Sequence, residues 1–133
     1  MSSPGPEQRE YASLLLRKAG GDLRAATTLR DAGLDDELVG FHAQQAVEKA
    51  AKAVLVLAGV EIPRTHDLER VLTLAEQAGH RLPDPVSEAG WLTPWAVEYR
   101  YDEATAPLDQ ASAVSTAEAV VGWASRLRDA LSG

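Results

Sequence analysis

The amino-acid sequence predicts an all-α protein, an up-and-down bundle of about five helices that forms one domain over residues 1–133. Apolar residues recur at spacings of three and four in each long segment, which is the period of a helix with one buried face. Glycine or proline stands near most points where this period stops, and no segment shows the sustained alternation of a strand. With 133 residues, 45% of them apolar, the chain is long enough to bury a single core.

The first helix is expected from Glu7 to about Ala32, after a disordered N-terminal stretch at residues 1–6. The apolar residues that share its inner face are Ala12, Leu16, Ala19, Leu23, Ala26 and Leu29. Their phase continues through Gly20 and Gly21, although each glycine costs about 1 kcal/mol of helix propensity. One long helix, straight or bent, is therefore favoured, and two shorter helices stay open as the alternative.

The second helix is expected to begin after Gly33, which can close the first helix in a left-handed conformation. Asp35 or Asp36 would be its N-cap, because acidic side chains accept hydrogen bonds from free amides and suit the positive end of the helix dipole. It runs to about Ala58 and ends at Gly59. This helix carries most of the polar residues discussed below.

The third helix follows an extended connector, because Pro63 disfavours helix in the residue before it. Thr65 is the expected N-cap of a helix from about Asp67 to Ala78, ended by Gly79. The residues expected on its inner face are Leu68, Val71, Leu72 and Ala75.

The fourth helix is expected from about Val86 to Tyr99, kinked or started by Pro94. The last helix is expected from about Leu108 to Leu131. Its expected buried positions are Val114, Ala117, Val121, Ala124 and Leu131. Short connections between five such helices favour the bundle.

Composition excludes several classes of function. The net charge is -7 and the isoelectric point is near 4.9, so the average surface would repel a phosphate backbone. The absence of Cys excludes disulfides, thiol catalysis and cysteine zinc sites, and is compatible with a reducing cytosol. No apolar run approaches the roughly 20 residues of a membrane span, and no signal peptide is recognised. A cytoplasmic protein without metal or cofactor is expected.

The second helix carries a dense polar cluster within an arc of roughly 140° at about 100° per residue. Its members are Gln44, Gln45, Glu48, Lys49 and Lys52. The plain interpretation is a solvated face with a Glu48–Lys52 ion pair one turn apart, worth about 0.2 to 0.5 kcal/mol. Apolar Phe41, Leu55 and Val56 interrupt the arc, however. Part of this face is therefore expected to meet a neighbouring helix or another subunit.

Two further segments could form a site. His66 and Asp67 stand at a helix start, where His66 could contact a phosphate or carry a proton, although local capping explains the same residues. Trp91, Trp95 and Tyr99 would share one face of the fourth helix. Such an aromatic stripe can stack bases but more often fills a core or a subunit interface.

Three segments, "FHAQQAVEKAAKAVLVLAG", "THDL" and "YRYDEA", in this order and spacing resemble the HEPN domain, a bacterial and archaeal family of helical bundles that also occurs in eukaryotes. The resemblance covers nearly the whole chain. It implies a bundle of about five helices, commonly a homodimer, often encoded beside a minimal nucleotidyltransferase as a toxin and antitoxin pair. The family has also been described as nucleotide-binding.

Many HEPN relatives are metal-independent ribonucleases that use an Arg followed, after four to six residues, by a His. This signature is absent, because no Arg of the chain precedes a His at that spacing and no His follows His80. Asp102 also stands where this subfamily often has Pro. By residue match, the resemblance assigns a polar, ligand-binding set: Gln45, Glu48, Lys52, His66, Asp67, Arg100 and Tyr101.

Three hypotheses follow. The first is a dimeric, non-catalytic or weakly catalytic binding module that pairs with a nucleotidyltransferase-like protein and binds a nucleotide in a polar cleft. The second is a metal-independent ribonuclease with a variant site, in which His66 acts as acid or base and Arg100, beside Tyr101, stabilises phosphate charge. The third is a structural scaffold, for which changing Lys52 or Arg100 alters stability but no binding.

Overall fold

The computed structural model describes residues 3–96 and 107–131 of the chain. Over these residues the helices are α1 (Pro6–Asp31), α2 (Asp36–Leu57), α3 (Leu68–Gln77), the 3₁₀ helix η1 (Val86–Trp95) and α4 (Gln110–Leu131). This part of the chain contains no strand, and the predicted all-α bundle is confirmed. None of the described helices is long and apolar enough to pass through a membrane.

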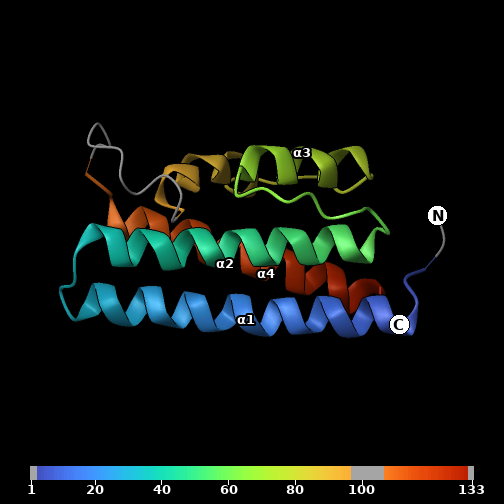
Figure 1. The fold of residues 1–133 in the computed structure, drawn as a ribbon, viewed down its shortest axis with the longest axis horizontal. Coiled ribbons are helices and arrows are strands. Elements are labelled where there is room, and N and C mark those ends of the chain that lie inside the picture. The colour runs from blue at the N-terminus through green and yellow to red at the C-terminus, as the bar shows by residue number, and fades with distance from the viewer. Residues whose placement is uncertain (1–2, 97–106, 132–133) are drawn as a thin grey trace.

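Helix α2 lies at the centre of the bundle and contacts every other described helix (Figure 1). Helix α1 runs antiparallel to α2, α4 packs against both, and α3 and η1 lie on the side of α2 away from α1. The fully buried alanines of α2 allow close approach of its neighbours, and they are Ala43, Ala46, Ala50, Ala51 and Ala53. Because α2 is surrounded, most of its polar side chains lie between elements rather than in open solvent.

Helix α1 is continuous through Gly20 and Gly21, as predicted. A methyl group added at Gly20 would meet only the tip of the Arg24 side chain, at 3.6 Å. The glycines are therefore not required for packing. After α1, Gly33 takes a φ of 78°, and Asp35 is the N-cap of α2, since its carboxylate accepts from the Leu38 amide at 3.3 Å.

The first described residues are part of the fold. Pro4 is buried, and its carbonyl accepts a hydrogen bond from Arg9 Nη1 at 2.6 Å. Pro6 begins α1, where its missing amide hydrogen costs nothing. Of the residues 1–6 that were expected to be disordered, Pro4 and Pro6 thus have defined places in the fold, and residues 1–2 lie outside the described residues.

The connector between α2 and α3, residues 58–67, runs back along α2. Lys52 Nζ donates to the Thr65 carbonyl at 3.0 Å, and Gln44 Nε2 donates to the His66 carbonyl at 3.3 Å. These bonds fasten the connector to the middle of α2. Helices α1 and α2 follow the expected up-and-down order, whereas this return lets α3 point in the same direction as α2 (Figure 1).

The N-cap of α3 is Asp67, so the prediction of Thr65 is wrong by two residues. The Asp67 carboxylate accepts from the Glu69 amide at 3.1 Å, while Thr65 Oγ1 accepts from the Asp67 amide at 3.0 Å, one step earlier in the chain. Both side chains thus satisfy amides that a helix start leaves free. The expected inner face is confirmed, because all four of its apolar residues are buried.

The segment Val86–Trp95 is a 3₁₀ helix, not the α-helix that was predicted to reach Tyr99. Gly90 and Pro94 both lower α-helix propensity, and a 3₁₀ helix has three residues per turn. Trp91 and Trp95 therefore do not share a face: Trp91 is 39% exposed, and the ring of Trp95 is buried against Gly40. The predicted aromatic stripe is wrong, and Tyr99 lies outside the described residues.

Helix α4 begins at Gln110 and is tied to the start of α2. Asp36 accepts from the Leu108 amide at 3.0 Å and from Gln110 Nε2 at 2.8 Å. Of the expected core positions, Val114, Ala117 and Ala124 are buried, whereas Val121 and Leu131 are only partly buried. Val120 and Trp123 are buried as well, so the inner face is broader than predicted and extends toward these two residues.

Candidate functional site

The candidate site is a polar network on the side of α2 that faces the connector. Gln44, Glu48 and Lys52 are spaced by four residues, which places them one above another on the helix. Gln44 is fully buried, Glu48 is 6% exposed, and the Lys52 side chain is 15% exposed. The partly buried face predicted from the interrupted polar arc is therefore found.

Glu48 is the centre of this network. Its Oε1 accepts from Gln44 Nε2 at 3.0 Å and from His66 Nδ1 at 2.7 Å, and its Oε2 accepts from Lys52 Nζ at 3.0 Å. Burial by itself would raise the pKa of Glu48, but the hydrogen bonds from Gln44, His66 and Lys52, with the Lys52 charge, outweigh it and lower that pKa below 4.5. The carboxylate is ionised at neutral pH.

The His66 ring is accessible to solvent, with 42% of its side chain exposed. Its Nδ1 is directed at Glu48, and its carbonyl is held by Gln44. Gln45 joins the network from the same helix, since its Nε2 donates to Gln44 Oε1 at 2.7 Å. Buried groups thus hold one accessible imidazole in a defined orientation.

Asp67 belongs to a neighbouring feature. Besides capping α3, it lines an open groove of about 350 Å³ between α3 and η1. The other residues that line this groove are Glu69, Gly90, Trp91, Thr93 and Pro94. Asp67 is next to the network because it follows His66 in the chain. Among the described contacts, it makes no hydrogen bond to Glu48.

The predicted site residues are placed only in part. Gln45, Glu48, Lys52 and His66 converge, and Gln44, which was not in the predicted ligand-binding set, joins them. Arg100 and Tyr101 lie outside the described residues. The i, i+4 spacing of Gln44 and Glu48 was the signal that could have added Gln44.

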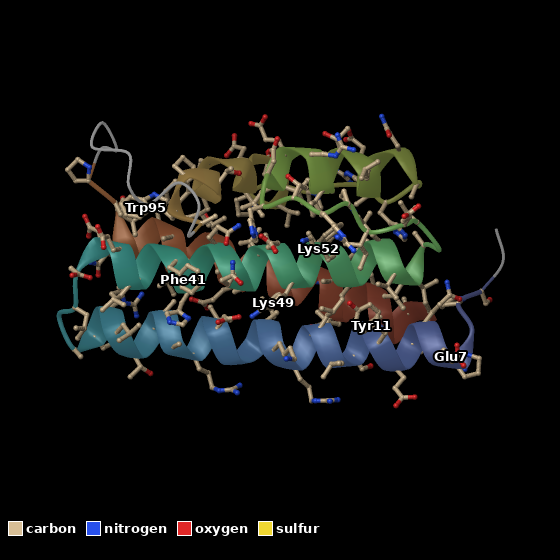
Figure 2. All side chains as sticks on the ribbon, viewed as in Figure 1. Glu7, Tyr11, Phe41, Lys49, Lys52 and Trp95 are labelled. Atoms are coloured by element: carbon tan, nitrogen blue, oxygen red, sulfur yellow. The ribbon has the colours of Figure 1, made fainter. Side chains whose placement is uncertain are left out.

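Lys49 is part of a second cluster, on the side of α2 that faces α1 (Figure 2). Its Nζ donates to Asp22 Oδ2 at 2.6 Å, and the other oxygen of Asp22 lies 3.1 Å from His42 Nδ1. Figure 2 shows Lys52 on the opposite side of α2, toward the connector. The sequence does not predict this cluster, because the partner comes from another helix.

The described residues satisfy one another well. No buried side-chain nitrogen or oxygen among them lacks a hydrogen-bond partner, and they contain no group of three or more His, Asp or Glu side chains suited to a metal ion. The groups of this network that can form hydrogen bonds with a ligand include the Lys52 ammonium and the His66 ring, whose Nδ1 faces Glu48.

Comparison with known proteins gives the family. The model of the HEPN domain matches residues 12–127, which is most of the chain from α1 to the last turns of α4. This chain belongs to the HEPN domain family. Neither a curated protein nor a solved structure gives a match. In this HEPN chain, the matched region contains the whole Glu48 network and the Asp22 cluster.

Proposed function

We propose that this HEPN protein is a dimeric binding module that pairs with a nucleotidyltransferase-like partner, in the manner of a toxin and antitoxin, and binds a nucleotide at the Glu48 network. The single observation that carries the proposal is the convergence of Lys52 and the accessible His66 on one buried carboxylate. In a chain with a net charge of -7, such a site can present a positive and a hydrogen-bonding group without a broad basic surface.

Nucleotide binding is tested by a pair of matched lysine variants. Lys52→Met should weaken the binding of ATP about tenfold or more in isothermal titration, because a charge-assisted hydrogen bond is worth about 1.5 to 3 kcal/mol. Lys49→Met is the control, since it removes the same charge from the same helix but its partner is Asp22, on the other side. Thermal unfolding of both variants separates folding from binding.

Two results would go against nucleotide binding at the Glu48 network. If ATP does not bind to the wild type, the nucleotide part fails. If Lys52→Met changes stability and leaves ATP affinity unchanged, the network is a structural scaffold.

Pairing with a partner is tested by co-expression with a nucleotidyltransferase encoded beside the gene, followed by light scattering. A strict monomer with no gain of affinity for the co-expressed protein would contradict the proposed dimer and its pairing.

A ribonuclease with a variant site is the second candidate. It is favoured by the 2.7 Å contact between His66 Nδ1 and Glu48, because a carboxylate that orients an imidazole is a common arrangement for a general base. The proposal predicts that pure protein cleaves RNA and that His66→Ala abolishes cleavage. His42→Ala is the control, since His42 contacts Asp22 instead. Equal, slow degradation by wild type and His66→Ala excludes this candidate.

A further inference from the structure

Gln44 is a neutral side chain in a position where few polar groups occur. It is completely buried, yet its amide makes three hydrogen bonds: Nε2 to Glu48 Oε1 at 3.0 Å, Nε2 to the His66 carbonyl at 3.3 Å, and Oε1 from Gln45 Nε2 at 2.7 Å. A buried amide is retained at low cost only when its partners are in place. Gln44 is therefore part of a built arrangement.

The orientation of this amide is determined by its surroundings. Two oxygen acceptors, from Glu48 and from the His66 backbone, lie beside Nε2. Rotating the amide by 180° would place Oε1 against both oxygens, which repel it. Gln44 therefore donates toward the His66 side, and it holds both the carboxylate that receives the ring and the backbone that carries the ring.

The ring of His66 is constrained in turn by Glu48. Glu48 Oε1 accepts from Gln44 Nε2 and lies 2.7 Å from His66 Nδ1. An ionised carboxylate only accepts hydrogen bonds, so the ring nitrogen that faces it must carry the hydrogen. In the neutral imidazole the lone pair is then on Nε2, the nitrogen that does not face Glu48.

We propose that Gln44 is a positioning residue that holds His66, through Glu48, in the tautomer with its hydrogen on Nδ1, so that Nε2 accepts a hydrogen bond from a ligand hydroxyl. The acceptance of a ligand hydroxyl by Nε2 rests on the proposed function, in which the hydroxyl belongs to the ribose of the nucleotide. The Lys52 ammonium, on the other oxygen of Glu48, remains the group for phosphate. In that tautomer the ring offers the ligand a hydrogen-bond acceptor rather than a positive charge.

The tautomer is measured directly by nuclear magnetic resonance on the full-length chain labelled with ¹⁵N-histidine. At about pH 8.5, above the ordinary imidazole pKa of about 6.5, the two ring nitrogens of a neutral histidine differ clearly in ¹⁵N shift. We expect His66 Nε2 to show the shift of an unprotonated nitrogen in the wild type. Gln44→Met, similar in length but without the amide, should give a mixture of tautomers.

Gln45→Met is the control, because it removes one bond to Gln44 and leaves the donation from Gln44 to Glu48 intact. Gln45→Met should keep the wild-type tautomer of His66. If Gln44 had only a structural role, Gln44→Met and Gln45→Met would both change stability, and neither would change the tautomer. A wild-type His66 with its hydrogen on Nε2 overturns the inference, and this spectrum is decisive even if Gln44→Met does not fold. An unchanged tautomer in folded Gln44→Met also overturns it.

Titration with ATP and 2′,3′-dideoxy-ATP tests the ligand hydroxyl. In the wild type, we expect ATP to bind several-fold more tightly than 2′,3′-dideoxy-ATP. In His66→Ala, we expect the two nucleotides to bind with equal affinity. If ATP does not bind, the proposed function and the assignment of the hydroxyl fail while the tautomer result stands. If ATP binds normally and Gln44→Met keeps the wild-type tautomer, the positioning role of Gln44 fails while the proposed function stands.

Discussion

Glu48 is the residue on which the candidate site depends most, because its two oxygens join α2, the connector and the accessible ring of His66. A buried carboxylate of this kind is stable only while its partners remain. The family resemblance of the sequence was the basis for predicting that Glu48, Lys52 and His66 lie close together, and in the structure they do. Spacing along α2 explains the Glu48–Lys52 pair, but only the folded connector explains His66.

The stability of the protein should depend on pH through Glu48. Its pKa is lower in the folded state than the ordinary value of 4.5, so the unfolded state binds more protons in the window just below that value. The stabilisation from Glu48 is therefore complete above about pH 4.5 and is lost as the pH falls through the folded pKa. Urea unfolding at several pH values between neutral and acidic measures this loss as a decrease in the free energy of unfolding.

Glu48→Gln is the variant that isolates this contribution. It should lower the free energy of unfolding at neutral pH by about 1 to 3 kcal/mol, because the bonds to Lys52 and His66 lose their charged acceptor. It should also show less loss of stability on acidification than the wild type. An identical pH dependence in the two proteins would show that Glu48 does not have a lowered pKa.

At the scale of the elements, most helices were predicted from local signals. Apolar period and caps are properties of neighbouring residues, so α1, α2 and the inner face of α3 were predicted closely. The type of η1 was not predicted, although Gly90 and Pro94 are local signals against an α-helix. The close contacts of Trp95 with Gly40 and of Glu69 with Gly90 join different elements and could not be predicted from neighbouring residues. The Asp22 contacts with His42 and Lys49 were missed for the same reason, since they require the register of α1 on α2.

Two glycine substitutions test this packing. A Cβ at Gly40 would lie 2.7 Å from Trp95 ring atoms, so Gly40→Ala should lower the free energy of unfolding by about 1 to 3 kcal/mol. A Cβ at Gly20 meets nothing closer than 3.6 Å, so Gly20→Ala should raise it by about 0.4 to 1 kcal/mol. Urea denaturation followed by circular dichroism measures both. Equal effects of the two changes would contradict the close contact of η1 with α2.

At the scale of the whole molecule, charge and burial favour a local rather than an extended binding surface. The net charge of the chain is -7. A long phosphate backbone would meet repulsion over most of such a surface, whereas a single nucleotide needs only one cation and a few hydrogen bonds. The charge of the chain is therefore the reason that we propose a small ligand rather than RNA.

Native mass spectrometry of the purified full-length chain with added ATP tests this central claim most directly, because it reports subunit number and bound ligand together. The account predicts a species of twice the 14.2 kDa chain mass that retains nucleotide. It also predicts that the nucleotide is lost in Lys52→Met and kept in Lys49→Met. A monomer that retains no nucleotide would contradict the claim.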